Sequence, residues 1–277
     1  MNKKKGVLFK YIKHDIKNGI GSQWKKYVAA GVIFSFLCGV VYRAVWASGQ
    51  HPGSTPLPAP TMGDYLFQLL QGSSRPYSQD FDVNVLWLLV NLFLGYIVSF
   101  YPFKDLHGYG QLMLIRSQKR NSWWFGKCVW NVGCVTLYYA VLWLVAGVFA
   151  LLTGSLSLVP TAEIQAVVTR GSVEGLTPAT MVFHALLAPW LASLAISMLQ
   201  MTVSLFTQPI IGVLMVCAVL VVSIFTDSFL APGNYLMMMR HGLSIPWAAG
   251  CLWLAFLVAA AVLAGYFGFK KRDIFSA

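Results

Sequence analysis

The chain contains few charged residues for its length. Only 10% of its 277 residues are Asp, Glu, Lys or Arg, whereas 57% are hydrophobic. A soluble domain carries roughly a quarter charged residues, so this composition does not supply a water-facing surface. Lipid must cover most of the protein, and the composition therefore predicts an integral membrane protein.

Acidic residues are scarcer still, with nine Asp and Glu against twenty Lys and Arg, for a net charge of +11. Sixteen of the twenty basic residues fall in three blocks, residues 1–26, 104–127 and 270–277, and these blocks hold only three acids. Basic loops stay cytoplasmic during insertion, and anionic lipid headgroups attract them. The pattern predicts that both ends of the chain are cytoplasmic, and it argues against nucleic acid as a partner.

Several motifs that carry enzyme chemistry are absent from the sequence. It has no G-x-x-x-x-G-K-[ST] phosphate loop, no zinc-ligand spacing and no G-x-S-x-G. We therefore expect no nucleotide site and no cofactor in this chain. The five cysteines lie in or beside apolar runs, which favours small apolar fillers over a disulfide framework.

Six segments are apolar and long enough to cross a hydrocarbon core of about 30 Å at 1.5 Å per helical residue. The uncharged stretch between Glu174 and Asp227 is too long for one crossing, and Pro209 divides it because proline interrupts a helix. The predicted fold class is an all-α membrane protein with six transmembrane helices. The predicted spans are residues 27–46, 83–103, 128–153, 179–206, 210–229 and 246–269.

The segments outside the spans also carry expectations. Residues 1–26 are predicted to form a cytoplasmic amphipathic helix in the headgroup plane, with a solvated tail as the alternative. Residues 230–246 contain a turn signal and a short apolar run, which predicts a re-entrant or interfacial segment. Residues 270–277 are predicted to be a cytoplasmic tail.

Ionisable residues in or near the spans have two interpretations each. His184 is isolated in sequence, and a satisfied histidine is a better interpretation than a ligand. Asp80 and Asp82 have the spacing of a metal-binding carboxylate pair, but a solvated start of a helix is favoured. Asp227 and Arg240 either pair at the outer surface or are solvated.

The basic loop after the second span contains a run, Leu112 to Ile115, that suits a short helix docking on a partner; a plain cytoplasmic loop is the alternative. Trp123 and Trp124 follow it and are expected to lie at the membrane interface.

The chain resembles the membrane subunit of an ABC-2 type ABC exporter in the order of its segments. This order is an amphipathic N-terminal helix, six spans with this loop after the second, and the segment from Pro232 to Arg240 before the last.

That resemblance implies a type V exporter fold with a coupling helix at about residues 106–122. In the family this helix docks on a separate ABC ATP-binding subunit, present in two copies, which holds ATP and magnesium. The implied docking residues are Leu112, Ile115, Arg116, Ser117 and Arg120. A second permease copy or a related permease, membrane lipid and a bacterial plasma membrane are also implied.

The same resemblance implies outward movement of an amphipathic or hydrophobic cargo, such as a peptide, lipid or toxin. Candidate outer-gate residues are Asp227, Asn234 and Arg240. Candidate path-lining residues, for which helix-to-helix hydrogen bonds are the alternative role, are Asn91, Asn131, Ser197, Gln200, Thr202 and Gln208. Two other functions stay open: an immunity or sensor subunit, and a membrane enzyme that acts on lipid.

Overall fold

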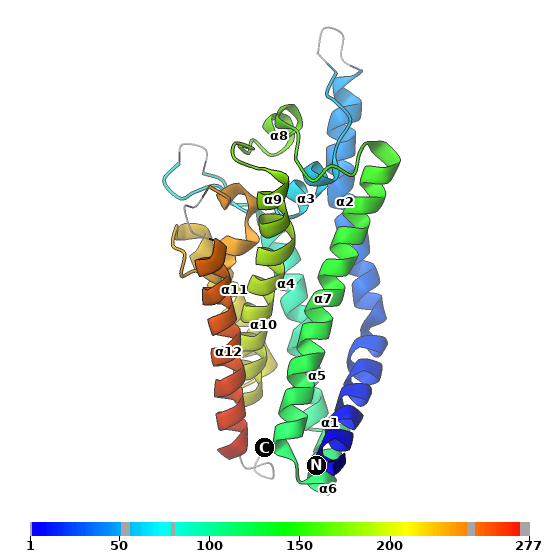
Figure 1. Ribbon diagram of the computed structural model, residues 1–277, viewed down its shortest axis with the longest axis vertical. Coiled ribbons are helices and arrows are strands. Elements are labelled where there is room, and N and C mark those ends of the chain that lie inside the picture. The colour runs from blue at the N-terminus through cyan, green and yellow to red at the C-terminus, as the bar shows by residue number, and fades with distance from the viewer. Residues whose placement is uncertain (1, 51–55, 79–80, 243–246, 272–277) are drawn as a thin grey trace.

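The computed structural model describes residues 2–50, 56–78, 81–242 and 247–271. Within these ranges the chain is helical, and the only β-type pairing is an isolated bridge between Thr61 and Ser155. The all-α prediction is therefore confirmed. Figure 1 shows an elongated bundle of long helices with shorter helices at both ends.

Five helical segments of the described chain are long and apolar enough to cross a membrane. The first joins α1 (Asn2–Asp15), the turns η1 (Ile16–Ile20) and η2 (Gly21–Gln23), and α2 (Trp24–Ser48). The others are α4 (Val85–Ser99) with α5 (Tyr101–Leu106), α7 (Arg120–Thr153), α9 (Pro178–Met181) with η3 (Val182–Leu187) and α10 (Ala188–Phe206), and α12 (Trp247–Lys271). These segments make the chain a multi-pass membrane protein.

The predicted fifth span corresponds to α11 (Pro209–Phe225), whose 17 residues make it shorter than the other five segments. It nevertheless runs the chain back along the bundle. The carbonyl of Pro209 accepts a hydrogen bond from Ser99 at the end of α4 (3.0 Å), and the carbonyl of Ser223 accepts one from Arg240 (2.6 Å). Whether α11 crosses the membrane by itself stays a prediction.

Short helices close the two ends of the bundle. We call the end with α1, α5, α6 (Tyr109–Ser117) and Lys271 the basic end. The opposite end, called the far end, holds α3 (Met62–Leu69), α8 (Ala162–Val168), η4 (Pro232–Leu236) and η5 (Met238–Arg240). The predicted re-entrant segment thus takes the form of two short 3₁₀ turns.

The longest helix, α7, is the central element of the packing. It lies against α1, α2, α3, α10 and α12. Buried hydroxyls of α7 also form hydrogen bonds to neighbouring helices. The hydroxyl of Tyr139 is 2.9 Å from that of Ser193 on α10, and the hydroxyl of Tyr138 donates to the carbonyl of Val90 on α4 (2.8 Å). Both phenols are buried, and an unpaired hydroxyl in an apolar core would lower the stability of the fold. These hydrogen bonds give each hydroxyl a partner.

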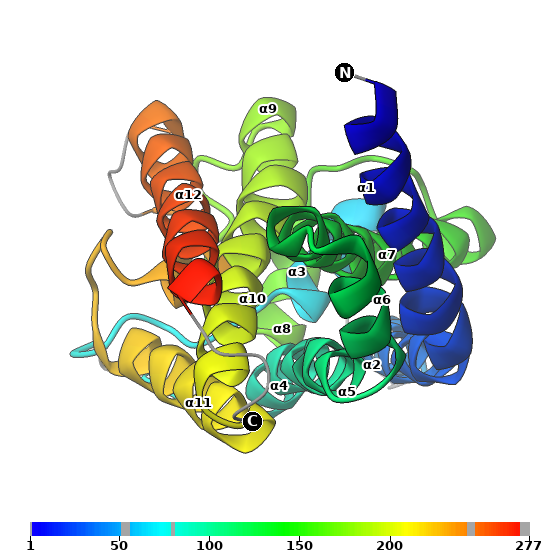
Figure 2. The same ribbon diagram turned by 90° about the horizontal axis from the view of Figure 1, so that it is seen from below.

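The N-terminal helix α1 crosses the basic end, as Figure 2 shows, whereas α2 continues along the bundle. Tyr11 is buried against the core, whereas Phe9 is 68% exposed. Gly19 lets η1 approach α7, because a Cβ there would meet the indole of Trp130 at 2.2 Å. The helix therefore packs on the protein with one face and leaves another open.

A buried carboxylate organises the loops of the far end. Asp64, with no exposed surface, accepts hydrogen bonds from the backbone amides of Thr61 and Thr161 and from the amide of Gln165, each at 2.8 Å. Thr61 and Asp64 also form a capping box at the start of α3. The segment between the first two predicted spans thus contains a capped helix joined to the loop after α7.

Close packing of α12 on α7 depends on a small residue at position 265. A Cβ at Gly265 would meet the indole of Trp124 at 2.1 Å, and this indole is buried and donates to the carbonyl of Val262. We expect Gly265→Ala to destabilise the protein by about 1–3 kcal/mol through overpacking, seen as a lower thermal unfolding midpoint in detergent.

Gly147→Ala on α7 is the matched control, because a Cβ there meets nothing within 4 Å. If both substitutions change the midpoint equally, the proposed α7–α12 contact is wrong.

Candidate functional site

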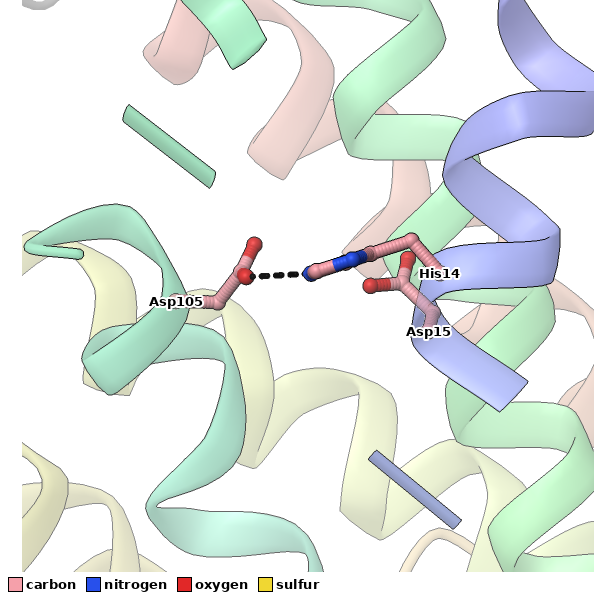
Figure 3. Close-up of side chains that lie close together, drawn as sticks. All are labelled: His14, Asp15 and Asp105. Carbon is pink, nitrogen blue, oxygen red and sulfur yellow. Dashed lines mark hydrogen bonds and ion pairs between the residues drawn. The ribbon is translucent and has the colours of Figure 1, made fainter. Parts of the chain in front are cut away.

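A buried charge cluster lies at the basic end, where three separate helices meet. The ammonium of Lys127 on α7 has no exposed surface and pairs with Asp15 at the end of α1 and, at 2.7 Å, with Asp105 on α5. Figure 3 shows His14 and Asp15 reaching from α1 toward Asp105, with His14 Nε2 3.2 Å from the Asp105 carboxylate. Tyr101 donates to Asp15 (2.8 Å).

Local sequence explains why these side chains converge. Gly110 in α6 lets the chain turn tightly over Asp105, because a Cβ there would lie 2.0 Å from the carboxylate. The indole of Trp123 donates to Asp105 at 3.1 Å and, like Tyr101, presents its ring to the Lys127 ammonium. These contacts hold the start of α7 and the short helix α5 together.

The cluster is stable only as a set, because removing charges from water is expensive unless they are paired and hydrogen-bonded. One lysine lies between two carboxylates. Tyr101, Trp123 and His14 form further hydrogen bonds to these carboxylates. The result is a polar joint between α1, α5 and α7.

This joint also contains, in the described part of the chain, the one group of three side chains that could hold a metal ion: His14, Asp15 and Asp105. The Lys127 ammonium already contacts both carboxylates. A cation would have to displace a buried positive charge, so the arrangement fits an internal ion-pair cluster better than a metal centre.

The helix α6 is attached to this joint by contacts with α1. The hydroxyl of Ser117 lies 2.7 Å from that of Tyr11 on α1, and the ring of His14 stacks on Tyr109 at 5.1 Å. Gln118 ends the helix in the left-handed conformation, with φ of 53°. α6 is thus held to α1 on one side and separated from α7 by a sharp turn.

The predicted docking residues divide into two groups. Leu112 (56% exposed), Ile115 (44%) and Arg116 point away from the protein on one face of α6. Ser117 faces α1, and Arg120 lies at the start of α7, where it donates to the carbonyl of Lys270. Only the first three therefore form an open surface.

The predicted path-lining residues lie mostly inside the single chain. Asn131 donates to Ser197 (3.1 Å), Gln200 to the carbonyl of Gly95 (2.8 Å), and Thr202 to that of Ala261 (3.2 Å). All four side chains are buried and tie α4, α7, α10 and α12 together, so the structure gives them the helix-to-helix role.

The other two behave differently. Asn91 is half-buried and donates to the carbonyl of Trp87, whereas Gln208 is exposed just before α11. A cavity of about 20 Å³, which suits about one water molecule, is lined by Asn91, Gln200 and Ser197, among others.

Arg240 at the far end is buried rather than solvated, and its contacts are not with Asp227. Its guanidinium donates to the carbonyls of Ser223, Ile224 and Thr226, which end α11, to those of Ser73 and Ser74, and to Asn234. Burial lowers the pKa of Arg240, and Asp227 opposes this shift. Neither sequence-based alternative, direct pairing or solvation, describes this residue.

The remaining sequence candidates do not form a site. Asp227 lies 3.9 Å from Arg75 instead of Arg240. His184 is beside His241, with ring centroids 6.3 Å apart. Asp82 is exposed, and its predicted partner Asp80 lies outside the described residues.

Sequence reasoning missed the buried cluster, although a signal was present. Asp15 and Asp105 are two of the three acids in the three basic blocks. An acid within a basic block has many cationic neighbours in the sequence. Its presence there could have indicated an ion pair inside the protein. The role of Lys127 had no comparable signal.

Comparison with known proteins gives a family. Residues 61–275 match the protein family described as a protein of unknown function, DUF2705. The chain belongs to the DUF2705 family. The match includes Asp105 and Lys127 of the cluster, whereas Asp15 precedes it. Neither the curated proteins nor the solved structures contain a match to the chain.

The ion pairs of the cluster can be tested with Lys127→Met. This change leaves two buried carboxylates without their cation, and we expect a loss of about 3–5 kcal/mol of stability, measured as thermal unfolding in detergent. Adding Asp15→Asn and Asp105→Asn should restore part of the loss. The exposed Lys25→Met is the control, and equal stability of the two lysine variants would contradict the assignment.

The carbonyl contacts of Arg240 can be tested with Arg240→Lys. Lysine keeps the charge but lacks the planar five-donor group, so several buried carbonyls lose their donor, at a cost of about 1–3 kcal/mol each. Hydrogen exchange should rise in residues 223–240 but not in α6. Arg170→Lys, at an exposed arginine, should change neither segment.

Proposed function

We propose that the chain is the membrane-spanning permease subunit of an ATP-driven ABC-2 type exporter. In this proposal α6 is the coupling helix, a separate ABC ATP-binding subunit supplies ATP and magnesium, and the chain itself hydrolyses no nucleotide. Two permease copies, identical or related, enclose the path for an amphipathic or hydrophobic cargo.

The observation that carries the proposal is the combination of an open face and a rigid attachment in α6. Leu112, Ile115 and Arg116 face outward, while Ser117 and the cluster around Asp105 bind the other side to α1 and α7. A force applied to this face passes through a charged joint into the longest helix. That is what a motor outside the membrane requires in order to move spans as rigid bodies.

The charge distribution supports the same orientation. The described lysines of the three basic blocks gather at the basic end, whereas the far end mixes acids such as Asp64 and Glu163 with arginines such as Arg240. A cationic end belongs on the cytoplasmic side. We therefore propose six crossings, with α11 completing the fifth, and both termini in the cytoplasm of a bacterial plasma membrane.

The buried hydrogen bonds of Asn131, Gln200 and Thr202 change how a path would form. They close the interior of one chain, so the cargo would move between two chains and not through one. An immunity or sensor subunit would use the same arrangement with a different cargo. The lipid-enzyme alternative loses support, because the described neighbours of His184 include the rings of Phe183 and His241 but no carboxylate, and Lys127 already pairs with both carboxylates at the basic end.

The docking face is tested by co-expressing the chain with ABC ATP-binding proteins encoded by neighbouring genes. Leu112→Ala with Arg116→Glu removes an apolar contact and reverses a charge on the open face of α6. We expect at least a tenfold loss of copurified ATP-binding subunit, because a hot-spot side chain contributes about 1.4 kcal/mol or more.

The matched control is Val28→Ala with Lys25→Glu, which makes the same two kinds of change at exposed residues of α2. Copurification that is the same for both variants, or no copurification with the unaltered chain, would contradict the proposal.

A further inference from the structure

A basic cavity opens beside the buried cluster, between α1 and the α5–α6 turn. Its volume is about 770 Å³, and it adjoins a second cavity of about 550 Å³ toward α2 and α4. The two share Asn18, Tyr101 and Lys104 in their walls, so they form one continuous groove.

Five lysines line this groove: Lys10, Lys13, Lys17, Lys26 and Lys104. None of them forms an ion pair with another described residue. The carboxylate in the wall is Asp105, which Lys127 and His14 already engage. The groove is therefore strongly cationic, and its charge is available to a ligand.

An apolar stripe leads into the groove along α4. Leu86, Leu89, Phe93, Tyr96 and Phe100 recur every three or four residues and so share one face of the helix. Three of them are about half exposed, Leu86 (50%), Leu89 (56%) and Tyr96 (46%). Phe100 and Tyr96 also line the groove, so the stripe ends where the lysines begin.

The ammonium of Lys26 marks this boundary. It lies 4.2 Å above the ring of Tyr96. An interface at which a cationic surface meets an exposed apolar strip matches a molecule with a negatively charged head and a hydrocarbon tail. Basic pockets between transmembrane helices on the cytoplasmic side are known to bind anionic headgroups.

We infer that the groove between α1, α4 and α5 is a binding site for one anionic phospholipid of the inner leaflet. The lysines contact the phosphate, and an acyl chain lies on the α4 stripe. The lipid would bridge α1 to α4 and α5. This site does not rest on the exporter proposal; it requires only that the basic end faces an anionic membrane surface.

Native mass spectrometry of the purified full-length protein tests the inference. The protein is equilibrated in micelles with equal amounts of phosphatidylglycerol and phosphatidylcholine. We expect one phosphatidylglycerol to be retained in preference to phosphatidylcholine. The variant Lys13→Gln, Lys17→Gln, Lys104→Gln should lose this preference by about tenfold or more, since each surface lysine contributes to headgroup attraction.

The matched control is Lys25→Gln, Lys270→Gln, Lys271→Gln, which removes the same charge from exposed lysines at the same end but outside the groove. It should keep the preference. Equal retention of both lipids by the unaltered protein, or the same preference in both triple variants, would overturn the inference.

Two further arms separate other ligands of the same chemistry. Inorganic phosphate in excess, at constant ionic strength, should leave the bound phosphatidylglycerol in place; complete displacement would assign the groove to free phosphate and overturn the lipid site. In the unaltered protein the preference should weaken as salt rises, a result that does not depend on any variant folding. Loss of the ATP-binding subunit in the groove variant with an unchanged lipid preference would assign the surface to a protein and also overturn it.

Discussion

One buried lysine determines how the basic end of this protein is built. The side chain of Lys127 has no exposed surface. A buried ammonium is costly unless a negatively charged group lies directly beside it. The two carboxylates that pair with it come from α1 and α5, which are far apart in sequence. Three helices must therefore meet at one point, and α6, which follows α5 directly, is placed by that meeting.

The consequence reaches beyond the joint, because Lys127 belongs to the longest helix. α7 begins in the cluster and ends against the loop of Pro60, with its flanks packed on α1, α2, α10 and α12. At the far end the fixed points are also polar: the Asp64 carboxylate joins two loops, and the Arg240 guanidinium joins the end of α11 to the loop before α4. Apolar helices supply the length of the bundle, and a few buried charges with several hydrogen bonds each fix its two ends.

Much of this architecture could be predicted from composition and hydropathy. The helical class, the membrane-length segments and the break at Pro209 follow from long apolar runs and a helix-breaking residue, which are local properties. The short helix in the basic loop could also be expected from the run between Leu112 and Ile115. In contrast, α11 ends at Phe225, whereas the uncharged stretch predicted a helix to residue 229. The carbonyls at the end of the helix bind Arg240, a contact that the sequence does not indicate.

The contacts of particular polar residues could not be predicted, because partners distant in sequence decide them. In the sequence Asp15 and Asp105 are only two acids among many basic residues, although both are buried in the cluster. For Arg240 the sequence left pairing with Asp227 and solvation equally open, but the residue instead binds backbone carbonyls, which carry no signature in the sequence. Asn131 and Gln200 read equally well as path-lining or as structural until the helices that they join were known.

Hydrogen exchange of the Asp105→Asn variant tests the central claim, that one charged joint holds α6 and α1 to the start of α7. This variant keeps Asp15 as a partner for Lys127 but removes the negative charge contributed by α5. We expect faster exchange in α6 and at the end of α1, with α3 and α8 unchanged at the far end. Unchanged exchange in α6, or an equal increase at both ends of the bundle, would contradict it.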